Sequence, residues 1–159
     1  MKALFFGGFL FLLASCSSQG TNAKAMGKAE ACDSLAEIKS MPLRDGWPET
    51  DPAYLKISNN REVAKSCLLD RISDSTQMMD PRSEPTKVNN FAVGDLAFFL
   101  LYEFKMVPFE EVLPGEVTKQ LAERGVFAYF EWVNKPGNRR QLQENCRKWI
   151  EENRGVRVN

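Results

Sequence analysis

The chain has 159 residues, with 21 Lys and Arg against 21 Asp and Glu, so its formal net charge is zero, and it contains no histidine. This length suits one domain with a substantial hydrophobic core. The balanced charge argues against a nucleic-acid partner, because neutralising phosphates requires an excess or a concentrated face of basic residues. The lack of histidine excludes histidine-based catalysis and most metal sites, and we expect neither a metal nor a cofactor.

Residues 1–15 have the layout of a secretory signal peptide. Lys2 precedes an apolar run, Ala3–Leu13, which two small residues close. This run is too short to cross a bilayer as a stop-transfer helix. Two alternative interpretations of this segment are an ordinary signal peptide whose cleavage site happens to contain a cysteine, and a short buried helix. The sudden change to polar residues at 17–20 argues against both.

The tetrapeptide Leu13-Ala14-Ser15-Cys16 resembles the lipobox of bacterial lipoprotein precursors. The resemblance implies cleavage before Cys16 and diacylation of its thiol, and two or three acyl chains hold a protein on a membrane essentially permanently. In Gram-negative lipoproteins, Asp after the acylated cysteine commonly signals retention in the inner membrane. Because Ser17 stands there, the resemblance implies the outer membrane, with the domain facing the periplasm. In a host with one membrane it implies the outer face of the plasma membrane.

Beyond the anchor, residues 16–27 are small and polar, as in a flexible tether, and residues 28–159 form the domain. Apolar residues at spacings of three and four predict a helix over 28–40. Residues 42–59 contain three prolines and predict a long loop. Asn60 is a plausible N-cap for a second helix, which ends near Ile72. The prolines of the next stretch, 73–87, exclude a helix there.

The second half of the chain is richer in helices. Residues 89–104 are apolar on nearly every side, which predicts a buried central helix, with a buried strand over 96–102 as the alternative. Proline and glycine then separate four further helical segments: 108–113, 115–124, 126–134 and 138–154. We therefore predict an all-α fold, a single compact bundle of five to seven helices with long proline-containing loops.

Three cysteines remain beside Cys16. If the first two predicted helices pack antiparallel, Cys32 and Cys67 lie at matching depths, which favours a disulfide between them. The alternatives are a bridge from Cys67 to Cys146, and three reduced core cysteines. Because the chain has no C-x-x-C motif and no histidine, the cysteines do not predict a metal site.

Charged residues gather around the end of the second predicted helix and the proline-rich stretch: Asp70, Arg71, Asp74, Asp80, Arg82 and Glu84. Paired carboxylates can divide the roles of acid and base, but here helix caps and surface ion pairs are the favoured interpretation. Arg82 is the member of most interest, because its guanidinium could bind Asp70 or Asp74 in a bidentate manner. Asp95, in the first turn of the apolar helix, is expected to be a structural cap.

Two further groups are candidates for contacts. Tyr129 and Trp132 lie in an aromatic run that is mostly core, but these two could reach the surface as an interaction patch. The last helix carries a basic stripe, Arg139-Arg140 with Arg147-Lys148, whose interleaved glutamates favour a solvated face.

No nucleophile with a visible base, phosphate-binding loop or catalytic motif is recognisable, so no catalytic residue is assigned. The sequence predicts a lipid-anchored helical binding protein of the cell envelope without catalytic activity. It would act through contact with an envelope or effector protein that the sequence does not identify. One alternative is an immunity or exclusion lipoprotein that neutralises a periplasmic toxin. Another is a carboxylate-based envelope enzyme, which predicts acidic residues of the charged group in a concave pocket.

Overall fold

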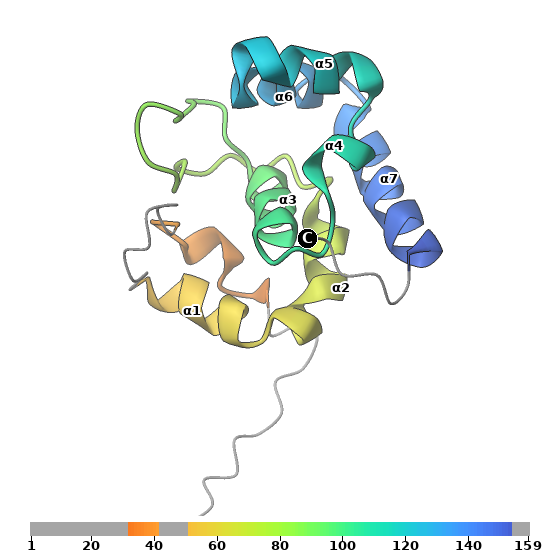
Figure 1. Ribbon diagram of the computed structural model, residues 1–159. Helices are drawn as coiled ribbons and strands as arrows, with labels where there is room; N and C mark the ends of the chain where they lie inside the picture. The colour runs from red at the N-terminus through yellow and green to blue at the C-terminus, as the bar shows by residue number, and fades with distance from the viewer. Residues whose placement is uncertain (1–31, 42–50, 154–159) are drawn as a thin grey trace, which may run out of the picture.

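The computed structural model describes residues 32–41 and 51–153. Within these ranges the chain is helical and has no sheet, only an isolated antiparallel bridge between Gln77 and Ala92. The elements are η2 (Leu35–Glu37), α1 (Pro52–Asn59), α2 (Arg61–Arg71), α3 (Val93–Glu103), α4 (Phe109–Val112), α5 (Gly115–Arg124), α6 (Val126–Val133) and α7 (Asn138–Glu152) (Figure 1). The predicted all-α class is confirmed. The signal peptide, the lipobox and the tether lie outside the described residues.

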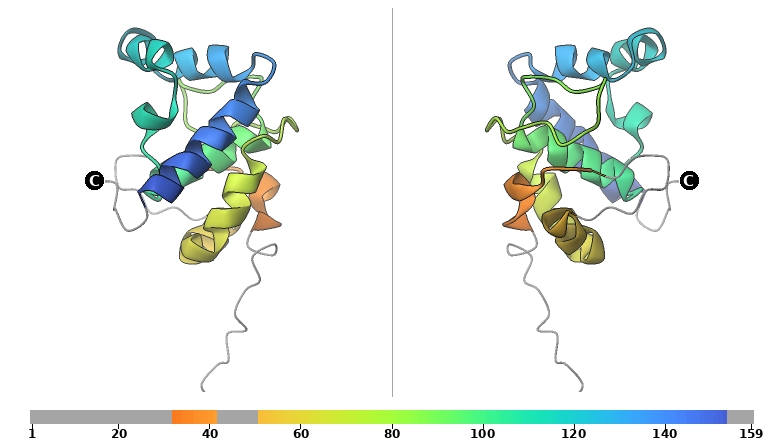
Figure 2. Two further views of the ribbon diagram at one scale, coloured as in Figure 1. Left: turned by 90° about the vertical axis from the view of Figure 1, so that its right-hand side faces the viewer. Right: turned by 90° about the vertical axis from the view of Figure 1, so that its left-hand side faces the viewer.

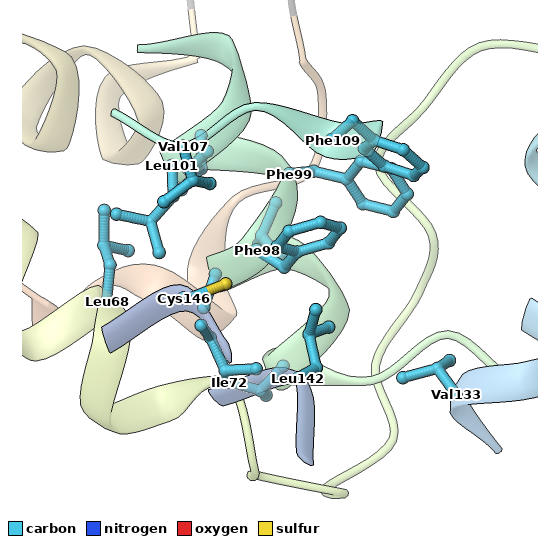
Figure 3. Close-up of a cluster of buried hydrophobic side chains, with 14 of the residues drawn as sticks. Leu68, Ile72, Phe98, Phe99, Leu101, Val107, Phe109, Val133, Leu142 and Cys146 are labelled. Carbon is cyan, nitrogen blue, oxygen red and sulfur yellow. The ribbon is translucent and has the colours of Figure 1, made fainter. Parts of the chain in front are cut away.

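Helix α3 lies at the centre of the fold, and every residue from Val93 to Leu101 is buried. Helix α2 packs along it, and α7 contacts α2, α4 and α6 (Figures 1 and 2). Figure 3 shows side chains of α3, α2 and α7 meeting in one apolar cluster, which includes Phe98, Leu68 and Leu142. The predicted central helix is confirmed, and the alternative strand over 96–102 is wrong because these residues lie inside α3.

The start of α3 lies directly against the end of α2. The amide of Gly94 donates to the carbonyl oxygen of Asp74 at 2.9 Å. A Cβ atom on Gly94 would lie 2.2 Å from the carbonyl oxygen of Ile72 and 2.7 Å from that of Asp74. Real side chains essentially never approach backbone so closely, so only glycine permits this contact between α3 and the segment that follows α2.

The prediction of a loop over 42–59 is wrong in its described part, 51–59, because helix α1 forms there. Asp51 caps the helix: its Oδ1 accepts from the amides of Ala53 and Tyr54 at 2.9 and 3.0 Å. Pro52 occupies the first helical position, where its missing N–H costs nothing. The proline that suggested a loop therefore begins a helix.

The helix predicted over 28–40 is also wrong in its described part, 32–41, which contains turns and 3₁₀ conformation, including η2, but no α-helix. Its buried residues Cys32, Leu35 and Ile38 recur at a spacing of three, the period of a 3₁₀ helix. The disulfide between Cys32 and Cys67 is confirmed, with Cα atoms 6.1 Å apart. It joins this segment to α2, although residues 32–41 form no α-helix that could pair antiparallel with α2. Cys146 is free and buried in the core (Figure 3).

Candidate binding site

A buried carboxylate joins α3, α6 and α7. Asp95, fully buried in the first turn of α3, accepts from the amide of Ala92 at 2.8 Å, as expected of a cap. It also accepts from the hydroxyl of Tyr129 at 2.8 Å. The guanidinium of Arg139 completes the site with a bidentate pair at 2.7 and 2.9 Å. We call these three residues, Asp95, Tyr129 and Arg139, the buried triad.

The hydrogen bonds of the triad define its chemistry. Four donors occupy the two oxygens of Asp95, which leaves no site where the carboxylate could accept a substrate proton. Burial, reinforced by the neighbouring Asp95, raises the pKa of Tyr129 well above its ordinary value. For Arg139, burial opposes the charge, but the hydrogen bonds and charge of Asp95 outweigh it and raise the pKa. The triad is therefore a fixed structural element.

An open hollow of about 640 Å³ lies beside the triad. It is bounded by the segment after α2, the end of α6, the turn from α6 to α7 and the first turn of α7. We call it the basic hollow, and its lining residues are Ser73, Ser75, Gln77, Val133, Asn134, Lys135, Pro136, Gly137, Arg139 and Arg140.

The lining of the basic hollow is cationic. Among the described residues, it contains three basic side chains and no carboxylate. Asp95 neutralises Arg139, whereas Lys135 and Arg140 are exposed and form no salt bridge with any residue that the structure describes. Hydroxyl and amide side chains supply further hydrogen-bonding groups, so the hollow suits a negatively charged, hydrogen-bonding ligand.

Arg82 occupies a different place from the one predicted. Its bidentate partner is Asp80, at 2.9 and 2.5 Å, and neither Asp70 nor Asp74. It also donates to the carbonyl of Thr86 at 2.8 Å. The guanidinium packs against three rings, 5.2, 5.0 and 4.6 Å from the centroids of Phe91, Phe99 and Phe130. Arg82 therefore clamps the loop after α2 onto the core and offers little surface to a partner.

Tyr129 and Trp132 do not form the expected surface patch. Their exposures are 0% and 8%, whereas Phe127 of the same helix is 44% exposed. The expectation was wrong because α6 packs against α5 and α7 and turns these two side chains into the core. The ring of Tyr129 lies 5.4 Å from that of Phe98.

The basic stripe of α7 is divided between two environments. Arg147 pairs with exposed Asp70 at 2.6 Å, as on a solvated face. The prediction of a solvated face is wrong for Arg139, because its side chain turns inward to Asp95, which lies 44 residues earlier in the chain. A sequence signal existed: an aspartate directly before the apolar run 96–101 of a buried helix requires a buried partner.

The predicted acidic group does not line the basic hollow. Asp74 and Asp80 pair with Arg71 and Arg82. Burial opposes their ionisation, but hydrogen bonds from arginine and backbone amides outweigh it and lower the pKa of both carboxyls. A general acid needs the opposite shift. Neither Asp74 nor Asp80 therefore has the raised pKa that the enzyme alternative requires of an acid.

The described residues contain no group of three or more cysteine, aspartate or glutamate side chains placed to hold a metal ion. Nor does any helix within 32–41 and 51–153 have the length and apolarity needed to cross a bilayer. Compared with protein-family models, curated proteins and solved structures, the chain gives no significant match.

Proposed function

We propose that the protein is a lipid-anchored, non-catalytic binding protein of the cell envelope, which contacts a partner protein through the basic hollow. The observation that carries this proposal is the lining of the hollow, which combines exposed Lys135 and Arg140 with hydroxyl and amide groups and contains no carboxylate. Such a surface provides charge complementarity and hydrogen bonds, and no described group there is poised to move a proton.

The scaffold of the hollow supports a binding role. Arg139, at the wall of the hollow, is held by two bonds to Asp95 and one to the side chain of Asn134 at 3.0 Å. Asn138 Nδ2 donates to the carbonyl oxygen of Trp132 at 2.8 Å, which fixes the turn from α6 to α7. A surface held in place before binding loses less conformational entropy when a partner docks.

The anchor rests on the lipobox Leu13-Ala14-Ser15-Cys16. We propose that Cys16 carries the lipid and that, with Ser17 behind it, the domain faces the periplasm from the outer membrane. Incorporation of labelled palmitate should be lost in a Cys16→Ser variant, and the protein should then leave the membrane fraction. Retention of label by this variant would contradict the anchor.

The binding role is tested by affinity capture. Purified Cys16→Ser protein is incubated with an envelope extract of its own host, and the proteins retained in stoichiometric amount are identified. We expect a partner that is lost when the hollow carries Lys135→Glu and Arg140→Glu. The matched control, Arg61→Glu with Lys119→Glu, makes the same charge change on exposed residues of α2 and α5 and should retain the partner.

The identity of the partner would decide between the two protein-binding alternatives. An envelope protein would support a general binding role, and a toxin would support an immunity role. Equal capture by both charge variants would contradict the assignment of the hollow as the contact site.

A further inference from the structure

A short stretch of paired backbone borders the basic hollow. Residues 74–78 run antiparallel to residues 91–94, the segment that leads into α3. Three hydrogen bonds of 2.9 to 3.0 Å join them: Gly94 N to Asp74 O, Val93 N to Thr76 O, and Met78 N to Phe91 O. Because pairing uses alternate residues of a strand, the backbone groups of the residues between point away from 91–94.

In the part of the chain that the structure describes, no backbone pairs with the outer edge of this stretch. Gln77 faces Ala92 in the bridge without exchanging hydrogen bonds with it, so the N–H and C=O of Gln77 are directed to the opposite side. Within the described residues, the backbone N–H and C=O groups of Ser75 and Gln77 have no hydrogen-bond partner. Both residues are exposed, and both line the basic hollow. This strand edge therefore belongs to the same surface as Lys135 and Arg140, which form no salt bridge with the residues described.

We propose that an extended, acidic segment of the partner protein adds to this edge as a further strand and places its carboxylates against Lys135 and Arg140. This inference rests on the proposed binding function and specifies the chemistry of the partner. Addition of a strand to an exposed edge is a common mode of peptide recognition, in which backbone hydrogen bonds supply affinity and alternate side chains supply specificity.

The positive charges of Lys135 and Arg140 favour an acidic segment as the ligand of the basic hollow. An acidic segment complements the two basic side chains, and the described lining of the hollow offers no carboxylate to repel it. Side chains on one face of a strand recur about every 6.6 Å, so acidic residues at alternate positions reach the same wall of the hollow. The chain's own ends do not fit, because residues 17–27 and 154–159 contain lysine and arginine but no aspartate or glutamate.

The proposal is tested with phage-displayed random octapeptides selected on immobilised Cys16→Ser protein. We expect the selected peptides to be enriched in Asp and Glu at alternate positions. Binding of a selected peptide, measured by fluorescence anisotropy, should weaken at least tenfold with Lys135→Glu and Arg140→Glu. It should change less than twofold with Arg61→Glu and Lys119→Glu.

Strand addition has a signature that charge attraction alone does not produce. N-methylation of alternate peptide bonds keeps the charge of the selected peptide but removes its edge donors, and we expect at least tenfold weaker binding. Exchange of the Ser75 and Gln77 amide hydrogens should slow at least tenfold when peptide is bound. The amides of Met78 and Gly94, which already donate within the protein, should change little.

Three outcomes would overturn the proposal. They are selected peptides without acidic residues, tolerance of N-methylation, and unchanged exchange at Gln77. Failure to select any peptide, while affinity capture still yields a partner that depends on Lys135 and Arg140, would refute recognition of an acidic strand and leave the proposed function standing. If no peptide is selected and affinity capture yields no partner that depends on Lys135 and Arg140, both the strand proposal and the proposed function are refuted.

Discussion

Replacing Arg139 with methionine should be among the most destabilising changes in the chain. The substitution keeps much of the apolar stem but leaves Asp95, which is fully buried, with only two of its four hydrogen bonds. Removing one partner of a buried ion pair costs about 3 to 5 kcal/mol, because an uncompensated charge remains in the interior. A domain of this kind has a total stability of about 5 to 15 kcal/mol, so the loss is a large fraction.

The assay is equilibrium unfolding in guanidinium chloride, followed by far-ultraviolet circular dichroism. Arg139→Lys is the matched variant: it keeps the charge but cannot form the bidentate pair, and its loss should be smaller, about 2 kcal/mol. Asp95→Asn combined with Arg139→Met should lose less stability than the sum of the single changes, because the two residues interact directly. A loss below about 1 kcal/mol for Arg139→Met would refute the role assigned to the triad, since that is the range of an exposed ion pair.

Three further predictions concern packing, the disulfide and the free thiol. Gly94→Ala should lower the free energy of unfolding by about 1 to 3 kcal/mol through overpacking against backbone, whereas Gly115→Ala, with nothing within 4 Å of its new Cβ, should cost nothing; equal losses in denaturant titrations would contradict this. Cys32→Ser opens a bridge that spans 35 residues and should cost about 3 to 4 kcal/mol in the same titration, and an unchanged midpoint would argue that the bridge does not constrain the unfolded chain. Burial raises the pKa of the Cys146 thiol to about 12. Because the unfolded thiol ionises near pH 8.5 while the folded one stays protonated, stability should fall above that pH by up to about 1.4 kcal/mol per pH unit. Cys146→Ala should remove this part of the slope, and identical pH profiles for the two proteins would exclude it.

The sequence was most informative where a local pattern determined the structure. The wholly apolar character of 96–101 correctly identified the buried helix α3. Pro114, Gly125 and Gly137 correctly separated α5, α6 and α7, because each of these residues acts on the backbone within a turn of its own position.

Long-range contacts account for what the sequence could not provide. The role of Arg139 depends on Asp95, 44 residues away, and the orientation of a side chain on a charged helix face is not encoded in its neighbours. The basic hollow likewise combines residues from 73–77 with residues from 133–140, which are far apart in the sequence and meet through tertiary packing. Asp51-Pro52 was misinterpreted for a local reason, since the same two residues occur in turns and at helix starts.

Photo-crosslinking in cells of the native host tests the binding role of the basic hollow most directly. A photoreactive amino acid is placed at Ser73, which lines the hollow, or at Glu62, which is exposed at the opposite end of α2, about 16 Å away along the helix. We expect one crosslinked protein at Ser73, which is absent at Glu62 and is lost with Lys135→Glu and Arg140→Glu. No crosslink at Ser73, or the same product from both positions, would contradict it.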